Sequence, residues 1–116
     1  MEFSEIMRTE KDEGKENHVP YIMVDKGHIE RQDIIRVSVG RYMRHPSWVE
    51  HHIVWIQLFG VKKDNNQVIN LGRAACAPVY SNPNVRFHVN QIKDFKSFHA
   101  LAYCNIHGLW ASSLER

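Results

Sequence analysis

The stretch His52–Phe59, which reads HIVWIQLF, decides the fold class of this chain. Apolar residues occupy its even-numbered and its odd-numbered positions, which point to opposite faces of an extended chain. Such a run of β-branched and aromatic side chains favours a strand. Because both faces are apolar, we expect this strand to be covered on both sides, or to meet a partner subunit on its outer face.

Further strands are predicted on either side of this stretch. Residues 33–40 contain the alternating run IIRVSV, and three more candidates lie at 67–76, 85–89 and 98–103. Asp64-Asn65-Asn66 is a turn signal that joins 52–59 to 67–76 as a hairpin. We find no convincing amphipathic helix. The pattern therefore predicts an all-β sandwich or barrel of short antiparallel strands.

Composition limits the class of protein. A chain of 116 residues, 43% hydrophobic and 24% charged, suits one ordinary globular domain. Its net charge of +2 is too small to indicate nucleic acid or a membrane surface as a partner. We find no apolar run of membrane-spanning length, and the polar N-terminus lacks the core of a signal peptide. We therefore expect a cytoplasmic protein, with residues 1–17 as an arm and 18–116 as a single domain.

Histidine is the compositional outlier, with eight in this short chain. Four of them fall in three short blocks that also hold a cysteine and, two residues before the first histidine, a carboxylate. The blocks are Glu16–Pro20 (ENHVP), His45–His51 (HPSWVEH) and Cys104–Trp110 (CNIHGLW). Imidazole and thiolate suit iron, zinc and copper, and a carboxylate adds a harder ligand. The three blocks together predict one metal site.

Spacing limits how these residues could share a metal. His45 and His51 would lie about 20 Å apart on a flat strand, so the segment between them must bend. His51 and His52 are adjacent and would point to opposite faces of a strand, so at most one of them can serve the metal. The spacing does not choose between them. Cys104 and His107 lie three residues apart, which suits a tight loop at a strand end.

The same residues carry a resemblance to a known family. The segments Gly14–Pro20 (GKENHVP), His45-Pro46, Glu50–Ile53 (EHHI) and Tyr103–Trp110 (YCNIHGLW) occur in an order and spacing that resemble superoxide reductase of the one-iron, neelaredoxin type. This type shares the iron-binding domain of the desulfoferrodoxin family. The chain has only two cysteines and does not resemble the two-iron desulfoferrodoxins, which add a four-cysteine rubredoxin-like module. The resemblance implies an immunoglobulin-like β-sandwich, often assembled as a homotetramer.

The resemblance also implies a site and a reaction. It implies one iron per chain, which makes residues 18–116 an iron-binding domain. The implied ligands are four equatorial histidines and one axial cysteine: His18, His45, His51, His107 and Cys104. Glu16, carried on the arm, would bind the oxidised iron. The implied enzyme reduces superoxide to hydrogen peroxide by one electron, taken from rubredoxin or a similar small carrier.

One position departs from the family pattern. Relatives usually have lysine directly before the first histidine ligand, where it is thought to attract superoxide and help protonate bound peroxide. Here that residue is Asn17, which can form hydrogen bonds but carries no charge. The resemblance therefore leaves Lys15 as the candidate for this catalytic role, with Lys11 as another local cation.

Two alternatives belong to other classes of protein. One is a non-catalytic metal-binding or electron-transfer β-sandwich module that uses the same ligands. A structural zinc site is normally closed and four-coordinate, so five matched ligands speak against it. The other is a plain interaction domain with accidental histidines.

Several side chains have a structural interpretation. Cys76, within the apolar segment AACA, is expected to be a buried, inert thiol. The three tryptophans are expected to form core or pocket walls: Trp48, Trp55 and Trp110.

Overall fold

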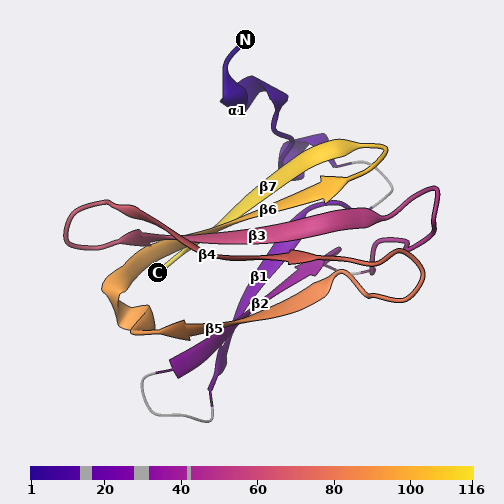
Figure 1. Cartoon of the computed structure of the whole chain (residues 1–116). Helices are drawn as coiled ribbons and strands as arrows, with labels where there is room; N and C mark the ends of the chain where they lie inside the picture. The colour runs from indigo at the N-terminus through magenta and orange to yellow at the C-terminus, as the bar shows by residue number, and fades with distance from the viewer. Residues whose placement is uncertain (14–16, 28–31, 42) are drawn as a thin grey trace.

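The computed structural model describes residues 1–13, 17–27, 32–41 and 43–116, and it is a sandwich of two antiparallel sheets (Figure 1). The first sheet has the order β1-β2-β5, with β1 Pro20–Lys26, β2 Gln32–Val39 and β5 Asn84–Asn90. The second has the order β4-β3-β6-β7, with β4 Val68–Ala75, β3 Ile53–Lys62, β6 Phe95–Cys104 and β7 Gly108–Glu115. The predicted all-β, immunoglobulin-like sandwich is confirmed.

All five predicted strands are present within a few residues of their expected bounds, but two strands were missed. These are β1 and β7, the edge strands that flank the site. The β7 sequence GLWASSLE has weak strand propensity. Its conformation comes from pairing with β6 over a register that runs from Cys104↔Gly108 to Ser97↔Glu115. The predicted hairpin turn is confirmed, because Val61 pairs with Val68 across it.

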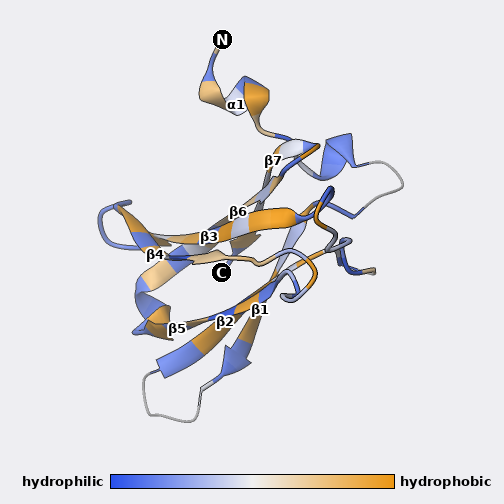
Figure 2. Ribbon diagram, turned by 45° about the vertical axis from the view of Figure 1, so that its right-hand side comes forward, coloured by the Kyte–Doolittle hydropathy of each residue, from blue (hydrophilic) through white to orange (hydrophobic). Residues whose placement is uncertain are grey.

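The hydrophobic core lies between the two sheets. Side chains that are 0% exposed come from both layers, including Ile35 and Val37 of β2, Ile56 and Leu58 of β3, and Phe98 of β6. Figure 2 shows apolar and polar residues alternating along the strands, as expected for sheets with one buried face.

One aromatic side chain on the outer face of β3 packs against neighbours in its own sheet. Trp55 is half-buried and stacks on Tyr103 of β6, with ring centroids 5.8 Å apart and 17° between the planes. The guanidinium of Arg73, on β4, lies 4.2 Å from the Trp55 ring centroid. This stack covers part of the apolar outer face, and contact of that face with a partner subunit stays a prediction.

The N-terminal residues form an arm that pairs with β7 at Arg8. The short helix α1, Phe3–Ile6, buries none of its residues and projects from the sandwich, and the 3₁₀ turn η1, Glu10–Asp12, follows it (Figure 1). Between them, the Arg8 amide donates to the Leu109 carbonyl (2.9 Å), and the Ala111 amide donates to the Arg8 carbonyl (2.8 Å). The arm is thus anchored on β7.

Among the described residues, no helix is both long enough and apolar enough to cross a membrane.

Candidate metal centre

The three histidine-containing blocks meet at one end of the sandwich. His18 precedes β1, His45 lies in the β2–β3 connection, His51 lies just before β3, and Cys104 is the last residue of β6. One potential ligand atom from each of these four side chains lies within 4.8 Å of the others. The β2–β3 connection bends between His45 and His51, as the spacing required.

His107 lies beside this group, in the turn between β6 and β7. Its Nδ1 is 2.9 Å from Nε2 of His18 and 3.7 Å from Sγ of Cys104. Its ring centroid is 5.0 Å from that of His51. The four predicted histidine ligands and the predicted cysteine ligand therefore lie together in the structure.

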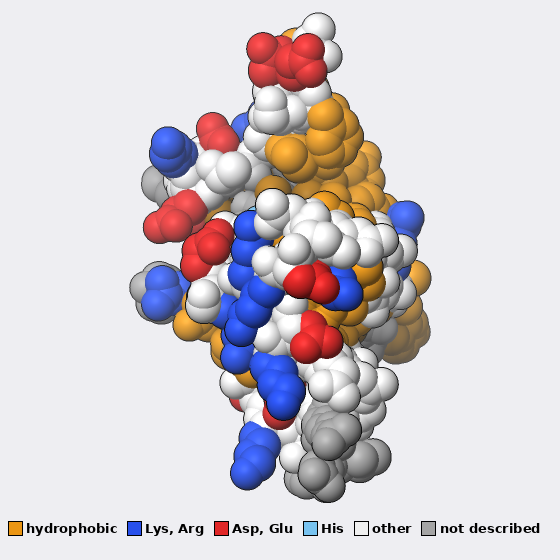
Figure 3. Space-filling view, turned by 90° about the vertical axis from the view of Figure 1, so that its left-hand side faces the viewer, with side chains coloured by type: hydrophobic (Ala, Val, Ile, Leu, Met, Phe, Trp, Pro, Cys, Tyr) orange, Lys and Arg blue, Asp and Glu red, His pale blue; other side chains and the backbone are white. Residues whose placement is uncertain are grey.

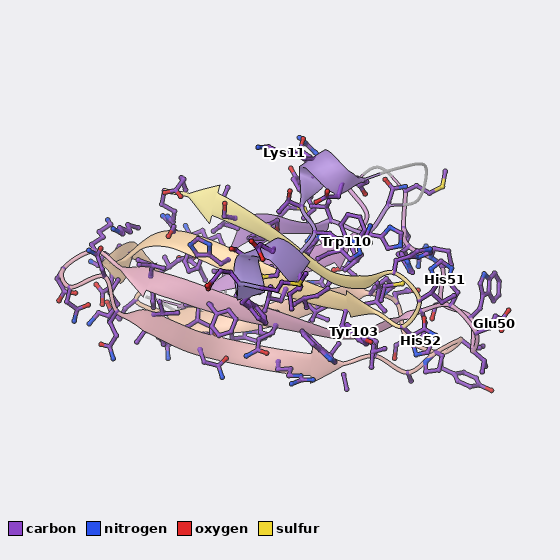
Figure 4. All side chains as sticks on the ribbon, turned by 90° about the horizontal axis from the view of Figure 1, so that it is seen from above. Lys11, Glu50, His51, His52, Tyr103 and Trp110 are labelled. Carbon is purple, nitrogen blue, oxygen red and sulfur yellow. The ribbon has the colours of Figure 1, made fainter. Side chains whose placement is uncertain are left out.

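His52 lies outside the group. Its Nδ1 is 3.0 Å from the carbonyl oxygen of Trp48, and Figure 4 shows it apart from His51. The structure thus distinguishes two adjacent histidines that the sequence spacing could not.

The sulfur of Cys104 is fully buried and receives a backbone hydrogen bond. Cys104 is 0% exposed, and the amide N–H of His107 donates to its Sγ at 3.4 Å. Amide donors stabilise a thiolate, which is the form that binds metal. The Asn105 amide does not share this role, because it donates to the His52 carbonyl at 3.1 Å.

The ring of His45 is held in one orientation. Its Nδ1 lies 2.8 Å from the carbonyl oxygen of Pro46. Because a carbonyl can only accept, Nδ1 must carry the proton, and Nε2 is left with its lone pair. That Nε2 atom lies 3.7 Å from Sγ of Cys104, on the side where the other proposed ligands meet.

Trp110 forms one wall of the site, as predicted. It is 2% exposed and stacks on His18, with centroids 4.6 Å apart and 12° between the planes. Its Nε1–H donates to the carbonyl oxygen of His107 at 3.2 Å. One indole ring therefore contacts two of the proposed ligands and shields them from water.

The prediction for Trp48 was wrong, because this side chain is 59% exposed. Trp48 and His51 exchange backbone hydrogen bonds of 2.8 and 3.2 Å across a tight turn. That turn brings His51 to the site and leaves Trp48 at its outer side.

Glu13 holds the backbone at His18. Its Oε1 accepts from the amides of His18, at 2.8 Å, and Val19, at 3.4 Å. Sequence reasoning missed this residue, and no sequence signal marks it, because a carboxylate in a charged arm is usually just solvated.

Asn105 joins the two loops that carry ligands. Its Oδ1 accepts from the His52 amide at 2.9 Å, and its Nδ2 donates to the Glu50 carbonyl at 3.0 Å. The sequence marked Asn105 only by its position between Cys104 and His107. Its role could not be predicted from that, because its hydrogen-bond partners lie more than fifty residues away in sequence.

The two remaining predicted site residues, Glu16 and Lys15, lie outside the described residues. Lys11 lies on η1 and lines a cavity beside β7, and Figure 4 shows it well away from His51. Asn17 lines a different cavity together with Arg41, whose guanidinium lies 4.8 Å from the centroid of the Tyr21 ring. Among the described residues that line this cavity, Arg41 is the cation. It therefore shares the cavity with Asn17, the position where the family usually has lysine.

The donor atoms fit one transition-metal ion. Metal–nitrogen bonds near 2.0 Å and metal–sulfur bonds near 2.3 Å place neighbouring ligands about 3 to 4 Å apart. The separations of 2.9 and 3.7 Å given above agree with this spacing. Four imidazoles and one thiolate also exceed the closed four-ligand set of structural zinc. Such a set suits a metal that keeps a position open for a small ligand.

Fold and site together define a β-sandwich protein with a buried histidine–thiolate metal centre, and known proteins of this kind match it. The desulfoferrodoxin family model matches residues 10–113. Superoxide reductase from Pyrococcus abyssi is 38% identical over 105 residues, which cover 86% of this chain and 87% of that protein. Neelaredoxin from Megalodesulfovibrio gigas is 34% identical over 111 residues, 84% of this chain and 85% of that protein.

Solved structures give the same result. Superoxide reductase (neelaredoxin) from Ignicoccus hospitalis has a TM-score of 0.83 at 31% identity, and the match covers 99% of this chain and 97% of that one. A superoxide reductase crystallised in the oxidised state has a TM-score of 0.84 at 31% identity, with 98% of each chain covered. This chain belongs to the desulfoferrodoxin family.

Proposed function

We propose that this protein is a superoxide reductase. It adds one electron and two protons to superoxide, which gives hydrogen peroxide and no dioxygen. The observation that carries this proposal is the group formed by His18, His45, His51 and Cys104, whose ligand atoms lie within 4.8 Å of one another. Superoxide reductases with matching length and fold support it.

The proposed centre holds one iron per chain, bound by the five side chains that the family resemblance implied. They are His18, His45, His51, His107 and Cys104. When bound, iron supplies the exchange of one electron between its ferrous and ferric states. The Cys104 thiolate would donate electron density toward the bound metal, and the His107 N–H, which donates to its sulfur, would tune that donation. The Pro46 carbonyl keeps the His45 proton on Nδ1.

Two charged residues complete the proposal through the family resemblance. Glu16 is proposed as the carboxylate that binds the oxidised centre, and Lys15 as a cation that attracts superoxide. Asn17 cannot supply that charge. Arg41 lines the same cavity as Asn17, together with the acidic residues Glu10 and Glu13. Positive potential at the entrance raises the encounter rate of an anionic substrate.

Partners, assembly and location belong to the same proposal. The electron donor is rubredoxin or a similar small carrier, and the assembly is a homotetramer. Residues 1–17 form the arm of each subunit and 18–116 its single domain. A cytoplasmic location suits two free cysteines, since thiols persist in a reducing compartment.

The test is metal analysis with visible spectra before and after oxidation, followed by superoxide addition to the reduced protein. We expect about one iron per chain, a broad red-region band on oxidation, and rapid reaction with superoxide. Cys104→Ser should abolish the band, whereas Cys76→Ser, the matched control, should keep it. Zinc in the site, or no reaction with superoxide, would move the site to the non-catalytic alternative.

A further inference from the structure

The end of the molecule that carries the metal centre also carries exposed apolar side chains. Five of them have relative exposures between 51% and 91%, and we call them the apolar rim: Trp48, Val49, Val79, Tyr80 and Ile106. Isolated exposed apolar residues are common, but a group at one functional end marks an interaction site. Figure 4 shows Glu50, from the same loop, projecting outward at this end.

The rim belongs to the same turns that hold the proposed ligands. Trp48 exchanges two backbone hydrogen bonds with His51. Ile106 lies between Cys104 and His107 in sequence, and the His107 amide closes that turn onto the sulfur. A protein bound on the rim would therefore contact segments that are directly connected to three proposed ligands.

Hydrogen bonds join the rim loops into one surface. The Val79 amide donates to the carbonyl (3.1 Å) and to Oγ (3.0 Å) of Ser47, and the Ser47 hydroxyl donates to the Ser81 carbonyl at 3.0 Å. Asn105 joins its own turn to the loop that contains Glu50. Val79 has a φ of 74°, which is strained for a β-branched residue. Strain of this kind persists where the surroundings hold a segment in place, and it often accompanies function.

Charge beside the rim favours an acidic partner. Arg41 and Arg44 line a cavity together with Met43, which is 70% exposed, and with Asn82 from the far side of the neighbouring loop. Within the rim loops, at residues 43–52, 77–81 and 105–107, Glu50 is the only carboxylate in the sequence. Two arginines therefore lie in the segment that leads into the rim loops, and those loops carry a single carboxylate.

The size of the rim favours a transient partner. A fully exposed large side chain has a surface of about 150 to 200 Å². Scaled by their relative exposures, the five rim side chains expose a surface on the order of 600 Å². Weak electron-transfer encounters bury less than about 1,200 Å² over both partners, whereas obligate homodimers bury about 2,000 Å² or more. The area of the rim equals the share that one partner contributes to an electron-transfer encounter. It is too small for one side of an obligate homodimer.

We propose that the apolar rim is the docking surface for a small acidic one-electron carrier protein whose redox centre lies beneath an apolar patch. The carrier loses one electron and the oxidised centre gains it, with no bond made or broken. This proposal rests on the proposed function, because it names the surface through which that site is re-reduced.

The experiment uses an acidic rubredoxin as the carrier and compares equivalent substitutions at the two ends of the molecule. Val49→Ser and Tyr80→Ser, singly and together, disrupt the rim. Val68→Ser is the matched control, because Val68 is 60% exposed against 68% for Val49. Val68 begins β4 at the opposite end, which Figure 3 shows lined by Lys and Arg side chains.

Two readouts are measured on the full chain. Zinc-loaded protein is titrated with rubredoxin and followed by NMR chemical shifts, so that docking is measured without turnover. The second-order rate of reduction of the iron-loaded, oxidised protein by reduced rubredoxin is measured separately. We expect the rim double variant to lose about tenfold in affinity and in rate, and Val68→Ser to match the wild type. Arg44→Gln should flatten the dependence of the rate on salt.

Equal docking by the wild type and the rim double variant would overturn the proposal, and so would an equal loss in Val68→Ser. A stable dimer of the wild type that Tyr80→Ser dissociates would also overturn it, by assigning the rim to a second copy of this chain. Failure of the proposed function is distinguishable, because the reduced wild type would then not react with superoxide whatever the zinc-loaded titration gives.

Discussion

Replacing Asn105 by alanine should loosen the metal centre without removing a ligand. The substitution deletes two hydrogen bonds, from the His52 amide (2.9 Å) and to the Glu50 carbonyl (3.0 Å). Each is worth about 1 kcal/mol, and Asn105 is solvent-exposed, so the expected loss in unfolding free energy is roughly 1 to 2 kcal/mol. For a domain of this size, that is a fall in Tm of roughly 5 °C.

The larger effect of Asn105→Ala should be on the metal. These hydrogen bonds connect the loop of His51 to the turn of Cys104 and His107, and the loss of such supporting contacts typically lowers metal affinity by about 10- to 100-fold. Affinity is measured by competition with a chelator, and stability by thermal unfolding of the metal-free chain.

The control for this prediction is Asn70→Ala. Asn70 is also exposed, and its Oδ1 also accepts a backbone amide, that of Gly72 at 3.1 Å, but it lies on β4. Asn105→Asp keeps the acceptor for His52 and loses the donor to Glu50, so its affinity should be intermediate. The reasoning is refuted if Asn105→Ala binds metal as tightly as Asn70→Ala does.

Three further predictions concern single side chains. Trp110→Phe keeps an aromatic ring on His18 but removes the donor to the His107 carbonyl, so urea unfolding should show a loss of about 1 kcal/mol; an unchanged midpoint would exclude that hydrogen bond as a contributor. Burial raises the pKa of the Cys76 thiol above its ordinary value of 9.0, so iodoacetamide at pH 8 should modify it more slowly in the folded chain than in urea. The associated stability is present below pH 9.0 and is lost as the pH rises toward the folded-state pKa, a decline that Cys76→Ser should remove. Asn17→Lys should speed the reaction with superoxide at low salt, with a smaller gain at high salt; no gain at low salt would show that another cation, such as Arg41, already supplies the charge.

Local sequence patterns determined much of the fold. The apolar alternation from residue 52 and the turn at Asp64–Asn66 predicted β3, the hairpin and β4, because side-chain period and turn chemistry depend only on neighbouring residues. The candidate metal ligands could also be predicted from local sequence, because the histidine and cysteine residues lie in short contiguous blocks. The five side chains proposed as metal ligands were all in those blocks.

The tertiary structure decided what depends on contacts between distant segments. It distinguished His51 from His52, because the His51 ring lies among the other proposed ligands, whereas Nδ1 of His52 lies 3.0 Å from the Trp48 carbonyl oxygen. It also revealed the support from Glu13 and Asn105, whose hydrogen-bond partners are set by the approach of separate loops. The edge strands β1 and β7 also depended on the tertiary structure, because pairing with β2 and β6 imposes their conformation. The sequence determined which ligands this protein offers, and only packing between the sheets determined which of them meet, because donor atoms within a few ångströms come from segments up to eighty-nine residues apart.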